Sequence, residues 1–75
     1  MFLISKPLEI GRCRIENGYS ITALGARSGL NPTTIFKLES GIKRVAPRTA
    51  KAVSDALGVS IYDLFELKSA GGDQA

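Results

Sequence analysis

Residues 20–41 read SITALGARSGLNPTTIFKLESG, and this stretch decides the fold. Ser20 and Asn31 are of the residue types preferred at the N-cap of a helix. Gly29 follows the first apolar stripe, where a helix can end on a left-handed residue. The stretch therefore predicts two short helices that are joined by the turn of residues 28–30.

The first of these helices runs over residues 21–27, and the second runs from Pro32 to the residue before Gly41. A glycine-containing turn this short sets two helices at a steep angle, so the pair is a helix-turn-helix. Gly25 falls where the two helices would cross most closely, and a residue without a bulky side chain is needed there. The apolar residues expected to face inward are Leu24, Leu30, Ile35 and Leu38.

The chain before this pair predicts one more helix, which begins at Ser5 or Pro7. Gly11 lies inside that helix, where it costs on the order of 1 kcal/mol relative to alanine. Residues 2–5 are either a short edge strand or an arm, and residues 1–7 are assigned to an N-terminal arm.

The chain after the pair predicts two further helices. Pro47 opens the fourth helix and Gly58 ends it. Ser60 caps a fifth helix that runs through Phe65 or Leu67, because apolar residues recur there at helical spacing. The prediction is an all-α fold, a compact bundle of five short helices.

The 75 residues make one small domain, over residues 8–67, followed by a flexible tail over residues 68–75. The chain has no histidine and only one cysteine, so it can build neither a disulfide framework nor a Cys/His zinc cluster. The chain also lacks the side chains that usually perform general acid–base catalysis and that activate a nucleophile. We therefore expect no enzyme, no cofactor and no metal. Cys13 is interpreted as a small buried hydrophobe, with a redox switch as the alternative.

The net charge of +3 is unevenly distributed. Residues 27–51 hold six lysines and arginines against Glu39 alone, whereas the residues after them are acidic. Such asymmetry is expected when one face meets a polyanion, and the alternative is a solvated surface. No apolar run has the length of a secretion signal or a membrane span. We expect a cytoplasmic, nucleoid-associated protein with no membrane partner.

Four groups of residues follow one another at set spacings: Arg14 with Gly18, Tyr19 and Ser20; Leu24, Gly25, Gly29 and Leu30; Thr34, Ile35, Leu38, Glu39 and Gly41; and Ala56 to Val59 with Asp63, Leu64 and Phe65. In this order, the stretch from Arg14 to Phe65 resembles the lambda-repressor-like helix-turn-helix family, the phage-repressor or xenobiotic-response-element type. The resemblance implies a five-helix domain whose third helix enters the DNA major groove while the start of the second helix meets the backbone.

The resemblance also implies site residues. Those at the base-facing positions of the third helix are Pro32, Thr33, Thr34 and Lys37. Those expected to contact the DNA backbone are Ser20, Arg27, Ser28, Asn31, Lys43, Arg44 and Arg48. The alternatives are a solvated surface for the cations and simple helix capping for the threonines and the asparagine.

Arg14 and Glu39 match an arginine and a glutamate that pair inside the fold of the family, so the resemblance implies a structural role for them. Among the departures from the family pattern, two concern the DNA site. Ile21 stands where many members have a glutamine that donates to a phosphate, and Pro32 stands where some members read adenine with a glutamine. The DNA site therefore cannot be copied from a relative.

Apolar residues near both ends of the domain exceed what a small core needs, and they are the candidates for a dimer contact: Phe2, Ile4, Tyr62, Phe65 and Leu67. The alternative is that they complete the core. We expect a homodimer that binds a palindromic double-stranded DNA operator and represses transcription for a phage, a plasmid or another bacterial mobile element. The other hypothesis is an antitoxin or adaptor that uses the same fold mainly to bind a protein partner.

Overall fold

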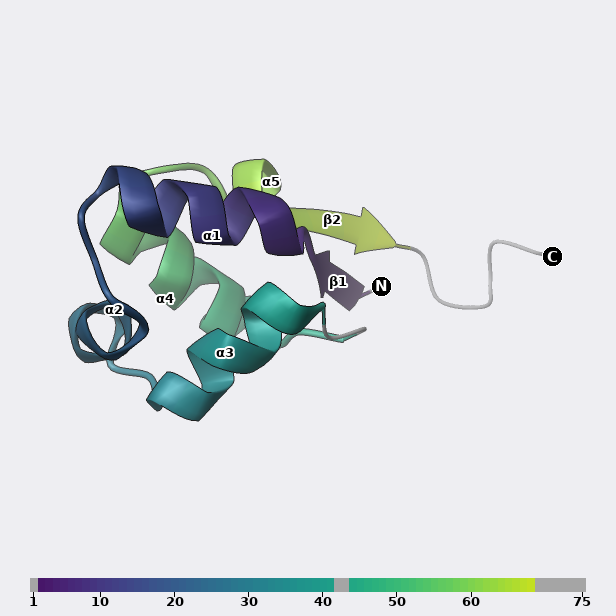
Figure 1. Ribbon diagram of the computed structural model, residues 1–75. Helices are drawn as coiled ribbons and strands as arrows, with labels where there is room; N and C mark the ends of the chain where they lie inside the picture. Colours follow the sequence, from purple (N-terminus) through teal and green to yellow (C-terminus); the bar gives the residue numbers. More distant parts are fainter. Residues whose placement is uncertain (1, 42–43, 69–75) are drawn as a thin grey trace, which may run out of the picture.

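A computed structural model describes residues 2–41 and 44–68 of the chain. Five helices surround a core, and two short strands lie beside them (Figure 1). The elements in chain order are β1 (Phe2–Ser5), α1 (Pro7–Glu16), α2 (Ile21–Ser28), α3 (Pro32–Ser40), α4 (Pro47–Leu57), α5 (Ile61–Leu64) and β2 (Phe65–Lys68). The predicted all-α fold of five short helices is confirmed, with a minor two-stranded sheet added.

Local capping sets the helix boundaries. The Ser20 hydroxyl accepts a hydrogen bond from the backbone N–H of Ala23 at 3.0 Å, at the start of α2. The Asn31 side chain accepts one from the N–H of Thr33 at 2.8 Å, at the start of α3. Gly29 ends α2 in the left-handed conformation, with a φ of 74°. Because each cap satisfies backbone groups that the helix itself leaves unpaired, the ends are defined by residues within one turn.

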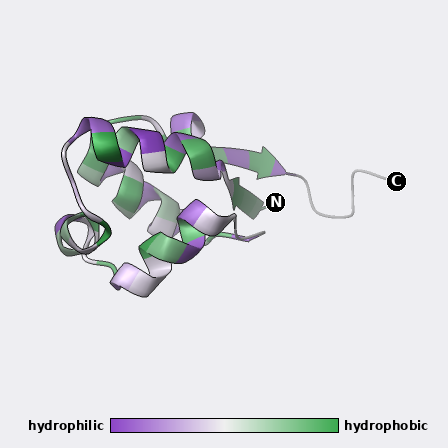
Figure 2. Ribbon diagram, viewed as in Figure 1, coloured by the Kyte–Doolittle hydropathy of each residue, from purple (hydrophilic) through white to green (hydrophobic). Residues whose placement is uncertain are grey.

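The core lies where α1, α2, α3 and α4 meet. α1 and α3 alternate apolar and polar colour along their length, as helices with one buried face do (Figure 2). Burying each large apolar side chain contributes about 1.5–3 kcal/mol relative to leaving it in water. The fully buried large apolar residues are Ile10, Leu24, Ile35, Leu38, Val53, Leu64 and Phe65.

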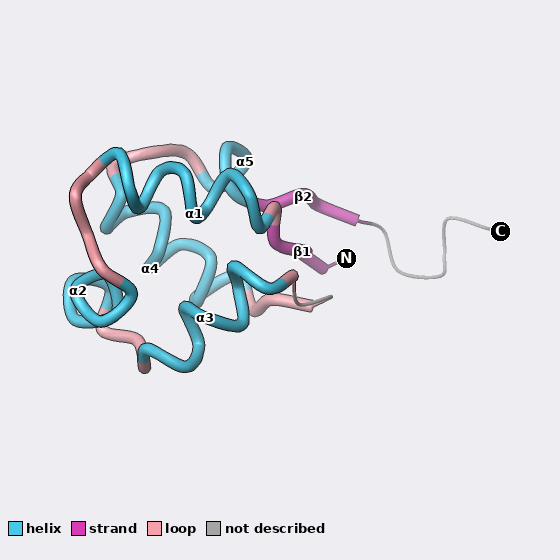
Figure 3. The backbone as a smooth tube through the Cα atoms, viewed as in Figure 1, coloured by secondary structure: helices cyan, strands magenta, loops and turns pink. Residues whose placement is uncertain are grey.

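The sheet joins residues that are far apart in the sequence. β1 and β2 run antiparallel, with Phe2 opposite Lys68 and Ser5 opposite Phe65 (Figure 3). On the other side of β1, the N–H of Val45 donates to the carbonyl of Leu3 at 2.8 Å. β1 is therefore the middle element of this small layer, and Leu3 is part of the core.

Three expectations about the chain ends need correction. Of the two alternatives for residues 2–5, the strand is confirmed and their assignment to an arm is wrong, because β2 and Val45 supply their backbone partners. The fifth helix ends at Leu64, since Phe65 takes an extended conformation and begins β2. Lys68 belongs to that strand, and the rest of the predicted tail, residues 69–75, lies outside the described residues.

Two glycines permit close approaches between helices. A Cβ atom on Gly25 of α2 would lie 2.8 Å from the backbone carbonyl oxygen of Leu30, which explains the predicted need for a small residue there. A Cβ atom on Gly11 of α1 would lie 3.2 Å from Oε1 of Glu39. The unfavourable glycine in the middle of α1 thus makes room for a carboxylate that α3 carries.

Candidate nucleic-acid interface

α3 presents one side to the core and the opposite side to solvent. Ile35 and Leu38 are completely buried, and Thr34 is half-buried beside them. Because residues three and four apart lie on the same side of a helix, the residues between Ile35 and Leu38 and one turn away from them face outward. The exposed residues of this outer face are Pro32, Thr33, Phe36, Lys37 and Ser40.

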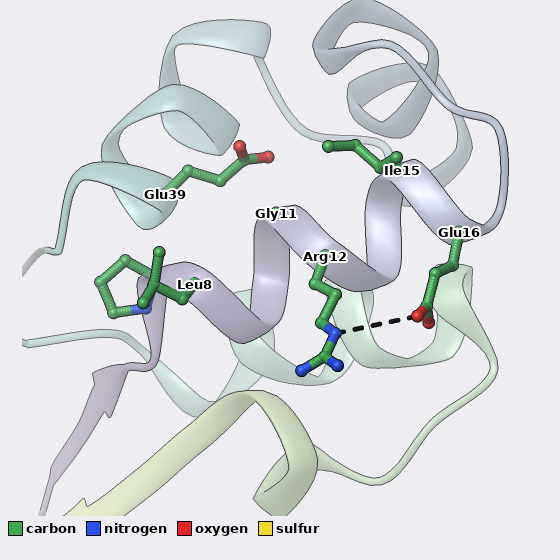
Figure 4. Close-up of a pocket in the computed structure, with 7 residues that line it drawn as sticks. Leu8, Gly11, Arg12, Ile15, Glu16 and Glu39 are labelled. Atoms are coloured by element: carbon green, nitrogen blue, oxygen red, sulfur yellow. Dashed lines mark ion pairs between the residues drawn. The ribbon is translucent and has the colours of Figure 1, made fainter.

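An ion pair holds α3 against α1. Arg14 Nε and Nη2 donate to the two carboxylate oxygens of Glu39 at 2.5 and 3.0 Å, and Nη1 donates to the carbonyl of Tyr19 at 2.9 Å. The two side chains are only 15% and 16% exposed. Figure 4 shows Glu39 reaching from α3 towards Gly11 on α1. The hydrogen bond to Glu39 raises the pKa of Arg14, so the arginine stays charged.

This pair changes the charge balance of the outer surface. Glu39 is the sole carboxylate within residues 27–51, and Arg14 already occupies it. Lys51 pairs instead with Asp55, at 3.0 Å on the exposed side of α4. The cations of this segment without a salt bridge among the described residues are Arg27, Lys37, Arg44 and Arg48.

Two of these cations rest on aromatic rings. The guanidinium of Arg27 lies 5.3 Å from the centre of the Tyr19 ring, and that of Arg44 lies 4.3 Å from the centre of the Phe2 ring. Arg48 is exposed in the first turn of α4. Lys43, the remaining predicted backbone contact of this loop, lies outside the described residues. The rings orient the arginines while leaving their charge at the surface.

The predicted polar contacts with the DNA backbone separate into two groups. Ser20 and Asn31 are exposed, and each uses its side-chain oxygen to cap a helix. The Ser28 hydroxyl donates inward, to the carbonyls of Leu24 at 2.8 Å and Gly25 at 3.2 Å. Ser28 therefore has no hydroxyl hydrogen free for a phosphate unless that internal bond breaks.

A family model described as helix-turn-helix matches residues 10–64, which is most of the chain and spans the α2–α3 pair. The chain belongs to the lambda-repressor-like helix-turn-helix family. Proteins of this helix-turn-helix family are DNA-binding regulators, so the outer face of α3 is a candidate DNA-reading surface. No curated protein is similar enough to the chain to count as a match.

The part of the helix-turn-helix domain that the structure describes was compared with the features of a membrane span and of a metal site. No helix there is long and apolar enough to cross a membrane. No group of three or more potential metal ligands comes together there.

The family departures noted from the sequence lie at the edge of this surface. Ile21 is half-buried at the first position of α2, and Pro32 is exposed at the first position of α3. Pro32 has neither an N–H nor a polar side chain, so it offers only shape to a base edge. The exposed side chains of the outer face of α3 that carry hydrogen-bonding groups are Thr33, Lys37 and Ser40.

The predicted dimer residues are not equally accessible. Tyr62 and Leu67 are exposed, whereas Phe2 and Ile4 are half-buried. Phe65 is fully buried as part of the core, so its assignment to a surface contact is wrong. Sequence reasoning also missed Phe36, an exposed aromatic on the outer face of α3. The signal was available, since Phe36 falls beside the Ile35 and Leu38 stripe and not on it.

Proposed function

We propose that the protein is a dimeric repressor that recognises a palindromic operator in double-stranded DNA. In this proposal it serves a phage, a plasmid or another mobile element and acts in the bacterial cytoplasm. The observation that carries the proposal is the outer face of α3. That face is exposed and bears Thr33 and Lys37, while the opposite face is anchored by the core and by the Arg14–Glu39 pair.

The proposed roles follow from side-chain chemistry. Lys37 donates to acceptors such as guanine O6 and N7, and Thr33 contacts a base edge through its hydroxyl or methyl group. Thr34 is half-buried, so it reaches the DNA from the side of the helix through its hydroxyl. The capping residues Ser20 and Asn31 bring the starts of α2 and α3, with their positive dipole ends, towards the phosphates.

The cations without a salt bridge among the described residues make the proposed DNA affinity depend on the salt concentration. Arg27, Arg44 and Arg48 each neutralise one phosphate in this scheme, while Lys37 contacts a base. Releasing the counterions of three phosphates predicts a plot of log affinity against log salt with a slope of about −2.7 for one subunit, and twice that for a dimer. A slope close to zero would contradict the DNA-binding role of this surface.

The arrangement of the elements favours a dimer contact through the sheet. In Figure 1, α5 lies on the side opposite α3, whereas β1 pairs with β2 on one side and bridges to Val45, which lies between α3 and α4 in the chain, on the other. A two-fold axis next to the sheet leaves both α3 helices free to face the same DNA. Leu67 is the exposed apolar residue of β2 and thus the contact that this dimer would bury.

The test is a selection of bound sequences from a random duplex pool at about 150 mM salt, followed by affinity measurements on the enriched duplex and a scrambled one. We expect an enriched palindrome. Sedimentation of the parent and of Leu67→Glu measures the dimer, which the added charge should weaken. A reporter gene behind the selected operator then distinguishes repression from activation. A pool without enrichment would overturn sequence-specific recognition.

One observation favours a second candidate, an antitoxin or adaptor that holds a protein partner. Leu8 and Ile15 are exposed on α1 and line a shallow hollow of about 450 Å³ together with Gly11 (Figure 4). Arg12 and Glu16 flank this apolar stripe and pair with each other at 3.8 Å. This candidate predicts that Leu8→Glu abolishes partner binding while operator affinity stays unchanged.

A further inference from the structure

Phe36 is the one large apolar side chain exposed on the outer face of α3, among the described residues. It is 60% exposed, although Ile35 beside it is completely buried. Phe36 lies within α3, and its backbone carbonyl accepts a hydrogen bond from the Ser40 hydroxyl at 2.9 Å. Phe36 therefore sits on regular helix with its ring directed away from the core that the rest of α3 packs against.

The neighbours of Phe36 indicate what its ring meets. Thr33 and Ser40 lie one turn before and after it on the same side of the helix, and Lys37 follows it directly. In Figure 2, α3 has apolar colour in its middle turns between paler and more polar ends. If α3 enters the major groove, a ring with hydrogen-bonding side chains on both sides of it lies among the base edges. The apolar group that base edges offer in the major groove is the thymine methyl group.

We propose that Phe36 reads a thymine in the operator by contact with its C5-methyl group. This inference rests on the DNA-binding function proposed above and adds an apolar contact to the hydrogen bonding of Lys37. Hydrogen-bonding groups distinguish donors from acceptors at base edges, whereas a ring held against a methyl group distinguishes thymine from cytosine and from any base without that methyl. Each half-site then contains one thymine whose methyl group is buried against the ring.

The experiment removes only the methyl group. Each thymine of the selected operator is replaced in turn by deoxyuridine, which keeps the base pair and all of its hydrogen-bonding groups. Burying one group of this size corresponds to about a fourfold change in affinity. We expect one thymine per half-site at which the parent protein loses about that factor, and Phe36→Ala should show no loss at the same thymine.

Two further variants distinguish an effect of the Phe36 ring on recognition from an effect on the fold. Phe36→Leu keeps an apolar side chain and should keep part of the sensitivity to deoxyuridine. Leu8→Ala removes an exposed apolar side chain from α1, 86% accessible, and should leave the sensitivity intact. Because Phe36 is exposed, the melting temperature of Phe36→Ala should equal that of the parent.

The outcomes are distinct. An operator that the parent binds equally well with thymine or deoxyuridine at every position would overturn the role of Phe36 and leave the proposed function standing. Equal sensitivity in the parent and in Phe36→Ala would assign the methyl contact to another residue. A change of sedimentation in Phe36→Ala, with weakened binding to every duplex alike, would make Phe36 a protein contact. A pool with no enriched sequence would overturn both proposals.

Discussion

Replacement of Glu39 by alanine should destabilise the fold far more than an exposed glutamate would. Arg14 is 15% exposed in the parent, and the change leaves its Nε and Nη2 facing the space that the carboxylate filled, with Nη1 still on the Tyr19 carbonyl. Breaking a buried pair by removing one partner costs about 3–5 kcal/mol. Because some water reaches this pair and one hydrogen bond persists, we expect a loss of about 2–4 kcal/mol, or roughly 10–25 °C in melting temperature.

The assay is urea unfolding followed by circular dichroism at the helix band, with Glu16→Ala as the matched control. Glu16 pairs with Arg12 at 3.8 Å, but their side chains are 67% and 69% exposed. An exposed pair on successive helix turns contributes only about 0.3–0.5 kcal/mol. If the two variants lose equal stability, or if Glu39→Ala loses less than about 1 kcal/mol, the reasoning about a desolvated pair is refuted.

The other predictions concern packing, recognition and a titrating thiol. Gly25→Ala should lower the unfolding free energy by about 1–3 kcal/mol in urea, since its Cβ would meet the carbonyl of Leu30 at 2.8 Å; a gain in stability would contradict the close approach. Lys37→Ala should weaken operator binding by more than about 1 kcal/mol in a titration at fixed salt without changing the melting temperature, whereas Lys51→Ala should bind normally, and equal effects would remove Lys37 from the site. Burial raises the pKa of Cys13 above that of the unfolded thiol, so stability is full below the unfolded pKa and falls as the pH rises through the folded one. Alkylation at pH 8 should accordingly be slower in the folded protein than in urea, and equal rates would mean a freely accessible thiolate.

The helical part of the fold could be predicted because its signals are local. Ser20, Asn31 and Ser60 each cap a helix within the next turn, and Pro47 begins α4 as its sequence position indicates. β2 was missed for the opposite reason. Phe65 continues the apolar spacing of α5, and only a partner strand about sixty residues earlier in the chain makes it extended.

The sequence predicts which residues form the candidate site better than it predicts how exposed and how free their side chains are. The sequence locates Thr33 and Lys37 on the exposed side of α3, where the structure has them. It cannot reveal that the Ser28 hydroxyl donates to carbonyls of its own helix, because that depends on the rotamer of the side chain. Nor can it explain Gly11, whose reason is a carboxylate that comes from another helix.

The pairing of β1 with β2 has a consequence for the order of folding. The helices and their α2–α3 turn depend on contacts between nearby residues, which form quickly. β1 gains its full set of partners only with β2, because Phe2 pairs with Lys68 and the N–H of Lys6 donates to the Leu64 carbonyl at 2.8 Å. During synthesis the first strand therefore leaves the ribosome long before its partner exists. Until residue 68 emerges, Leu3 lacks part of its cover, and the nascent chain carries an open strand edge that a chaperone or a second nascent copy can occupy.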